Sequence, residues 1–416
     1  MRRAAVSCAV ISLVSLAACD DLLSVDSNPN IVDAGVAGTL QETMVGASVE
    51  LYRAVDEAIS HAGLYGDEFV SASTGPLHRR MGARQVTAEA QQGSTGSGRP
   101  QSLGGGFYIP LQRLLAVAHL SQERILNGDF PQTAPSDDVA QYARLAFYEG
   151  LAKLYLADLY CTVAFYGTGP EYSSDQAYEQ AVEHFTHAID AGQVEPAVRD
   201  AALVMRARAR LILGDDAGAA ADAALVDPEF EFNVGYSTAT FEQRNRIHVH
   251  TYDVGDWSIA PRFRQLTIDD TEIEDPRTLV EGPAQAFDAS QELWVPLKYP
   301  VPASPIRIAS GDEARYILAE VAGGQTAVNM INEVRARHGI PTEWMPTGGL
   351  NEIRDKLIDE RARTLFLEGT HLGDLRRYMN KYGLDLFPTE NPHGIEVGNQ
   401  TCMPMPAIER DNNPDL

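Results

Sequence analysis

The chain has 416 residues with a formal net charge of −25, and 44% of its residues are hydrophobic. This composition is ordinary for a globular protein and supplies ample material for a hydrophobic core. The negative charge repels nucleic acid and anionic membrane surfaces, which argues against both as partners. The length allows either two domains or one large domain.

Residues 1–18 have the layout of a secretory signal peptide, with Arg2 and Arg3 before an uncharged apolar run. This run is shorter than the roughly 20 residues of a membrane-spanning helix, and no other stretch is long and apolar enough to span a bilayer. The Leu-Ala-Ala-Cys sequence that ends at Cys19 resembles the lipobox of bacterial lipoproteins. The resemblance implies cleavage before Cys19, acylation of its thiol and amine, and a stable lipid anchor. The alternative is an ordinary signal peptide followed by an incidental cysteine.

Residues 19–35 are polar and are interpreted as a tether that leads into the fold. Apolar residues then recur at helical spacing from about Val36 to Ala62, which predicts a first helix. Residues 64–106 are irregular and rich in glycine. Because no Gly-Lys-Ser/Thr sequence follows these glycines, a surface loop is a better interpretation than a phosphate-binding loop.

Helical spacing resumes at 107–160 and at 177–191. Residues 197–228 and 311–338 are each interpreted as two antiparallel helices joined by a glycine-containing turn, a pattern that resembles a tetratricopeptide repeat. One or two such repeats cannot stand alone and must pack on the other helices. We therefore expect a mostly α fold in which tetratricopeptide-like helix pairs pack as one compact domain over residues 36–416.

An insert at about 229–309 interrupts the helices, because its prolines exclude long helical segments. Short runs such as Ile247–Tyr252 and Glu292–Leu297 predict strands that alternate with turns, so the insert is expected to be irregular and partly β. It carries Trp257 and Trp294 among several aromatic residues. Loops on a rigid scaffold commonly carry binding function; the alternative is that these rings fill a small local core.

Cys161 and Cys402 are the cysteines that remain once Cys8 leaves with the signal peptide and Cys19 carries the lipid. A single pair in an exported protein predicts a disulfide, because the compartment permits one. Such a bond would pin the C-terminal tail to the helical core. Two unpaired buried thiols are the alternative.

The sequence contains only weak matches to the residue patterns that are typical of enzyme active sites. His248 and His250 would share one face of a strand, but a metal site needs further ligands and none is indicated. His184 and His187 stand one helical turn apart outside any His-Glu-x-x-His pattern, so they are expected on the surface. No Gly-x-Ser-x-Gly motif is present. We therefore predict no catalytic residue, no metal and no cofactor.

The most specific motifs lie near the C-terminus. Residues 357–369 read Leu-Ile-Asp-Glu-Arg-Ala-Arg-Thr-Leu-Phe-Leu-Glu-Gly, and residues 373–378 read Gly-Asp-Leu-Arg-Arg-Tyr. A Pro-Met-Pro sequence at 404–406 and Asn-Pro at 413–414 close the chain. Together with the segment 332–339 and the lipobox, these motifs resemble the SusD/RagB family of outer-membrane nutrient-binding lipoproteins.

Charged residues of this C-terminal segment are expected to form structural ion pairs. Asp359 and Glu360 both lie within one helical turn of Arg363, which predicts pairing with it. Asp374, Arg376 and Arg377 are expected to join the same kind of network. Arginine–carboxylate networks are structural more often than catalytic.

The family resemblance implies a lipid-anchored protein that is exposed on the cell surface at the outer membrane. Such a protein would bind an oligosaccharide or a peptide and deliver it to a SusC-like TonB-dependent transporter. Trp257 and Trp294, with Tyr252 behind them, are the predicted ligand contacts, because aromatic stacking and exclusion of water give affinity without catalysis. None of the family motifs includes these three positions. The alternative function is a tetratricopeptide-type scaffold that assembles envelope proteins and binds no nutrient.

Overall fold

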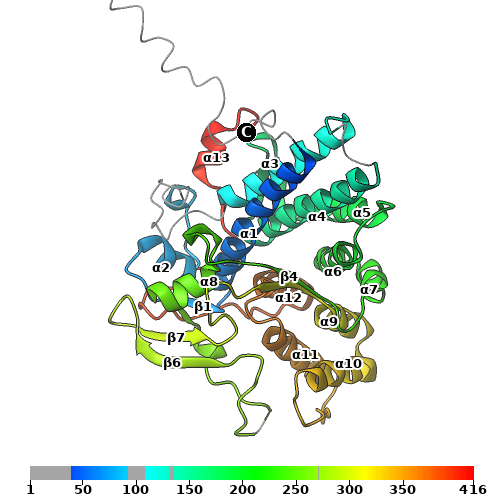
Figure 1. The fold of residues 1–416 in the computed structure, drawn as a ribbon. Helices are drawn as coiled ribbons and strands as arrows, with labels where there is room; N and C mark the ends of the chain where they lie inside the picture. Colours follow the sequence, from blue (N-terminus) through cyan, green and yellow to red (C-terminus); the bar gives the residue numbers. More distant parts are fainter. Residues whose placement is uncertain (1–38, 92–107, 131–134, 270) are drawn as a thin grey trace, which may run out of the picture.

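The computed structural model of the chain describes residues 39–91, 108–130, 135–269 and 271–416. The predicted signal peptide, the lipidation site Cys19 and the tether lie outside the described residues. No helix in the described part is long and apolar enough to cross a membrane. Helices dominate the regular secondary structure and the strands are short (Figure 1), which confirms the expected mostly α fold.

Long helices build the N-terminal part of the core. They are α1 (Leu40–Tyr65), α3 (Tyr108–Leu126), α4 (Pro135–Leu159) and α5 (Ser174–Asp190). α1 begins at Thr39, which forms a capping box with Glu42 and so satisfies backbone N–H groups of the first turn. α4 packs against α1, α3 and α5, and it is therefore apolar on most of its circumference, with Leu145, Phe147, Leu151 and Tyr155 buried.

Both predicted helix pairs form. The first is α6 (Pro196–Ile212) with α7 (Asp216–Ala223), and the second is α9 (Gly311–Ala322) with α10 (Gly324–Arg337). Gly214 turns the first pair with φ 81°, a conformation that glycine adopts without steric cost. The side chain of Asp215 then caps α7 by accepting from the N–H of Gly218 at 2.9 Å.

The C-terminal helices extend this row. α11 (Leu350–Thr364) and α12 (His371–Tyr382) follow the second pair. α7 packs on α9, and α9 packs on both α10 and α11, so α6, α7, α9, α10 and α11 line one side of the molecule (Figure 1).

The strands form separate antiparallel pairs. They are β1 (Phe69–Ser71) with β5 (Trp257–Ile259), β2 (Thr162–Phe165) with β3 (Thr168–Ser173), β4 (Glu231–Val234) with β8 (Ile306–Ser310), and β6 (Val280–Gln285) with β7 (Glu292–Pro296). The strands from β4 to β8 fall in or at the end of the predicted insert, which is partly β as expected. The remaining short helices are α2 (Pro76–Gly82), α8 (Arg246–His248) and α13 (Ala407–Asn412).

The prediction of a strand at 247–252 is wrong, because this segment is helical. α8 continues directly into a π-helical turn, Val249–Val254. The Asn245 side chain caps α8 by accepting from the N–H groups of Ile247 and His248, and the buried Asp56 carboxylate accepts from the Arg246 N–H at 3.0 Å. These caps stabilise a helical start that outweighs the strand preference of the β-branched residues.

Buried ion pairs hold the C-terminal helices together. Arg361 lies 3.1 Å from Glu313 and 2.6 Å from Asp374, and all three side chains are buried. Arg377 extends the network by pairing with Asp374 at 2.9 Å. Asp359 pairs with Arg363 at 2.9 Å, as expected from their spacing.

Two of the expected pairings are wrong. Glu360 points away from Arg363 and pairs instead with Arg277 at 2.6 Å and Arg335 at 2.5 Å. Arg376 donates to the backbone carbonyl of Ala157 at 2.6 Å rather than to a carboxylate. Arg277 and Ala157 come from distant parts of the chain, which helical spacing cannot reveal, whereas Glu360 also pairs with Lys356 one helical turn away at 2.8 Å.

Candidate functional site

Strand pairing between β1 and β5 builds two walls of an open cleft. The register places Phe69 opposite Ile259, and the N–H of Ala260 donates to the carbonyl of Glu68 at 2.9 Å. Asp67, just before β1, therefore lies near Arg262, just after β5. Asp67 has φ 67°, a left-handed conformation that is uncommon for residues other than glycine.

The third wall is the loop at 386–392, which comes from the C-terminal part of the chain. The cleft has a volume of about 440 Å³ and is lined by Asp67, Val70, Pro261, Arg262 and residues 386–392. Phe387 is buried beneath the Arg84 guanidinium, which lies 4.7 Å from the ring centroid. Beyond the loop, His393 Nε2 lies 2.7 Å from the carbonyl oxygen of Ser71. These contacts fix the loop against β1.

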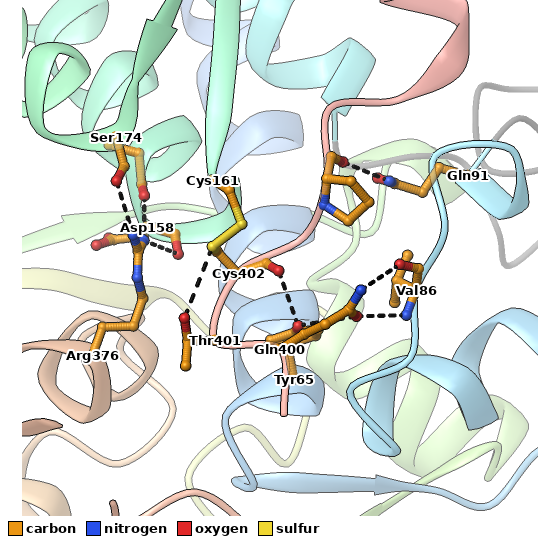
Figure 2. Close-up of a disulfide and its surroundings, with 12 residues drawn as sticks. Tyr65, Val86, Gln91, Asp158, Cys161, Ser174, Arg376, Gln400, Thr401 and Cys402 are labelled. Carbon is orange, nitrogen blue, oxygen red and sulfur yellow. Dashed lines mark hydrogen bonds between the residues drawn. A yellow bond between two sulfur atoms is a disulfide. The ribbon is translucent and has the colours of Figure 1, made fainter. Parts of the chain in front are cut away.

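A disulfide joins Cys161 and Cys402, with their Cα atoms 5.1 Å apart (Figure 2). The same tail is also held by hydrogen bonds: the Tyr65 hydroxyl donates to the Cys402 carbonyl at 3.1 Å, and the Gln400 amide group bonds both backbone groups of Val86. The C-terminal tail is thus anchored to α1 and to the end of α4, downstream of the cleft loop.

The charged groups of the cleft are not engaged by the protein. Neither the Asp67 carboxylate nor the Arg262 guanidinium forms a hydrogen bond or ion pair with any residue that the structure describes; Arg262 only lies over the Phe263 ring, 5.1 Å from its centroid. Burial raises the pKa of Asp67 to about 6, and Arg262 partly opposes this shift. The cleft therefore offers a free hydrogen-bond acceptor and a free donor side by side.

Apolar residues surround these polar groups. Val70, Pro261, Pro388 and Pro392 contribute to the walls, and Thr389, Glu390 and Asn391 add polar side chains at the loop. Pockets for small molecules are mostly apolar with a few placed polar groups that fix orientation. This arrangement suits a ligand with many hydroxyl groups and apolar ring faces.

Trp257, one of the predicted ligand contacts, is a core residue. Its side chain is 0% exposed. The His250 ring stacks on the indole at a centroid distance of 4.0 Å, and His61 and His78 approach it edge-on at 5.1 and 5.3 Å. Because the residue is fully buried, Trp257 has no accessible surface on which a ligand could stack.

Trp294 and Tyr252 are not brought together with Trp257 in an open site. Trp294 is 7% exposed, and its indole N–H donates to Glu292 at 3.2 Å. Tyr252 is half-buried, stacks on His248 at 4.9 Å, and donates its hydroxyl to the Pro296 carbonyl at 3.1 Å. These contacts describe packing within the insert.

The exposed aromatic residue of the insert is Phe287, which the sequence did not single out. It is 59% exposed at the turn between β6 and β7. The turn is fixed because Asp288 accepts from Arg79 at 2.6 Å, and Gln291 reaches the Pro392 carbonyl at 3.4 Å. The hairpin end therefore borders the cleft loop. Polar turn residues follow Phe287 in the sequence. This pattern could have indicated that the Phe287 ring is exposed.

The histidines serve packing in this fold. His248 and His250 do not share a strand face, since the segment is helical, and His250 lies 2.9 Å from Asp256. His184, expected on the surface, is instead half-buried beside Glu149 at 3.2 Å, whereas His187 is exposed. Within the described ranges, no group of three or more His, Cys, Asp or Glu side chains is arranged to hold a metal ion.

Known proteins resemble this chain in sequence at one end and in fold along its length. Residues 313–416 match the family model described as the SusD family. A SusD superfamily protein from Bacteroides vulgatus ATCC 8482 is 16% identical, with a TM-score of 0.68 over 91% of this chain and 98% of its own. No curated protein matches the chain.

Two further solved structures carry names that state a ligand. Surface glycan-binding protein A from Bacteroides uniformis has a TM-score of 0.66 at 14% identity, and a laminarin-binding SusD-like protein has 0.62 at 15% identity. Each match covers 90% of this chain and 98% of the other.

The chain shares a mostly helical fold with solved SusD superfamily structures over nine-tenths of its length. The resemblance stated from the C-terminal motifs is confirmed, because residues 313–416 match the SusD family model.

Proposed function

We propose that this protein binds an oligosaccharide in the cleft between β1, β5 and the 386–392 loop. It would deliver this ligand to a SusC-like TonB-dependent transporter while a lipid on Cys19 holds it at the outer membrane. The observation that supports the proposal most is the unengaged pair Asp67 and Arg262 in a cleft that also has apolar walls.

Sugar hydroxyl groups fit this pair, because each hydroxyl both donates and accepts. The Asp67 carboxylate accepts from one hydroxyl and the Arg262 guanidinium donates to a neighbouring one. Apolar residues in the walls pack against the C–H faces of a sugar ring, and Phe287 on the adjacent hairpin provides an exposed ring for stacking. In this proposal the protein binds the sugar and does not act on it.

An oligosaccharide is preferred over a peptide because structures of the same fold include proteins named for binding glycans.

The test is calorimetric titration of the purified chain with a panel of oligosaccharides and, in parallel, of peptides. We expect one glycan class to bind, and Asp67→Asn to weaken that binding about tenfold or more, since a hydrogen bond to a charged group is lost. Glu179→Gln is the matched control, because Glu179 is exposed on α5, away from the cleft. Binding of peptides alone, or equal losses in both variants, would contradict the proposal.

A further inference from the structure

The exposed ring of Phe287 stands on a backbone that is fixed to the end of β1. The N–H of Asp288 donates to the carbonyl of Ala72 at 2.8 Å, and the N–H of Phe287 donates to the carbonyl of Gly255 at 2.8 Å. The Asp288 carboxylate also accepts from Arg79 at 2.6 Å. The Phe287 residue nevertheless remains 59% exposed. A ring whose backbone is already ordered binds a ligand at a smaller entropic cost than a ring on a flexible loop.

The cleft reaches the hairpin turn that carries this ring. The unengaged charged pair of the cleft lies beside the start of β1, and Val70 lines the cleft further along the same strand. The 386–392 loop forms the third wall. The carbonyl of Pro392, at the end of this loop, accepts from the Gln291 side chain in the turn at 3.4 Å. The cleft loop therefore joins the charged pair to the turn of Phe287.

The two ends of this path lie too far apart for a single sugar unit. Hydrogen bonds to the residues that flank β5 extend the strand pairing from Glu68 to Ala72. This extended stretch advances about 13 Å, at about 3.3 Å per residue. Asp67 precedes its first residue, and Asp288 is bonded to its last. A pyranose ring is much shorter than this stretch, so one ring cannot contact both ends.

We propose that the site selects linear oligosaccharides by their length. One sugar unit is held by Asp67 and Arg262, and a later unit of the same chain stacks on the Phe287 ring. This inference rests on the proposed function, because it adds a second contact point for the same glycan. Phe287 is then the residue that sets the chain length at which affinity is complete, whereas a monosaccharide binds through the charged pair alone.

The test is calorimetric titration of the purified full chain with laminari-, malto-, manno- and xylo-oligosaccharides, each from one to six units. In a series that binds, we expect affinity to rise with length until the chain reaches Phe287 and then to level off. Phe287→Ala should weaken the binding of the longest oligomers about three- to tenfold, because one ring contact is lost. It should leave the binding of the shortest oligomers unchanged.

Three further variants separate length selection from general loss of binding. Asp67→Asn should weaken short and long oligomers alike, because both contact the charged pair. Phe287→Trp keeps an aromatic face and should retain the binding of long oligomers. Leu225→Ala is the matched control, because Leu225 is also an exposed apolar residue, at 60%, but lies outside the cleft lining. This variant should bind every oligomer as the wild-type chain does.

The outcomes distinguish this inference from the proposed function. The inference is overturned, and the proposed function stands, if a monosaccharide binds as tightly as its hexamer. The same conclusion follows if Phe287→Ala weakens short and long oligomers equally, or weakens neither. Absence of binding by every oligomer would contradict the proposed function itself, and the inference with it.

Discussion

At the scale of single residues, buried charges need partners to remain buried. Replacing Arg361 with Met leaves Glu313 and Asp374 with one cation fewer in a site that excludes water. We expect Arg361→Met to lower the free energy of unfolding by about 3–5 kcal/mol, measured by denaturant titration. Arg315→Met, which removes an exposed pair with Glu333, should change it by less than about 1 kcal/mol. Similar losses in the two variants would argue against a structural network.

Burial favours the neutral form of His78 and His61 beside Trp257. Burial lowers the pKa of His78 to about 4, and the charge of His250 adds to this shift. His78 Nδ1 accepts from the Trp257 indole N–H at 3.3 Å, which requires that nitrogen to be unprotonated. Burial also lowers the pKa of His61.

The shift of the His78 pKa contributes a loss of stability in mild acid. The unfolded chain takes up a proton on this histidine near pH 6.5, whereas folded His78 resists it until about pH 4, so the His78 contribution to the free energy of unfolding falls as pH drops between these values. His78→Gln, which can still accept from Trp257 but does not titrate, should reduce this fall by up to about 3 kcal/mol. Denaturant titrations at pH 7, 5.5 and 4.5 measure it, and an unchanged pH dependence in the variant would contradict the assignment.

At the scale of elements, the Cys161–Cys402 bond ties the C-terminal tail to the end of α4. Replacing both cysteines with Ala should lower the free energy of unfolding by about 2–5 kcal/mol, because the bond closes a long loop in the unfolded chain. Thermal unfolding with and without a reducing agent provides the comparison. The reductant should shift the midpoint of the wild-type protein to that of the variant and leave the variant unchanged; a wild-type midpoint that does not move would contradict a stabilising disulfide.

Local signals in the sequence were sufficient for the two helix pairs. Gly214 and Asp215 mark the turn and cap of the first pair, and both act through neighbours in the chain. They were not sufficient at 64–106, which was interpreted as a surface loop but contains α2.

The strand expected at 247–252 was wrong because the helical start has two caps. Asn245 is a local cap that the prediction missed, and Asp56 is almost 200 residues away. Local propensity is overridden where such caps stabilise another structure.

The candidate cleft could not be predicted from the sequence, because its walls come from distant parts of the chain. Asp67, Arg262 and the 386–392 loop meet only through the β1–β5 pairing and the anchored tail. The choice of Trp257 rested on residue type, and a tryptophan in an insert is equally suited to a local core. Phe287, by contrast, is exposed because it lies at the turn of the β6–β7 hairpin.

At the scale of the whole molecule, we propose that a lipid at Cys19 attaches the protein to the membrane. Cys19→Ser should release the protein from the membrane fraction into the soluble fraction, because two or more acyl chains are needed for stable anchoring. Cell fractionation with immunoblotting measures this. Retention of the serine variant in the membrane fraction would contradict lipid anchoring.

The central claim is that this protein captures a glycan for an outer-membrane transporter. The most direct measurement is affinity purification of the full chain from detergent-solubilised outer membranes, followed by identification of co-purifying proteins and bound sugars by mass spectrometry. We expect a TonB-dependent barrel to co-purify with the wild-type chain, together with a bound oligosaccharide. We expect the Asp67→Asn variant to lose this oligosaccharide. Purification of the chain with neither a barrel nor a glycan would contradict it.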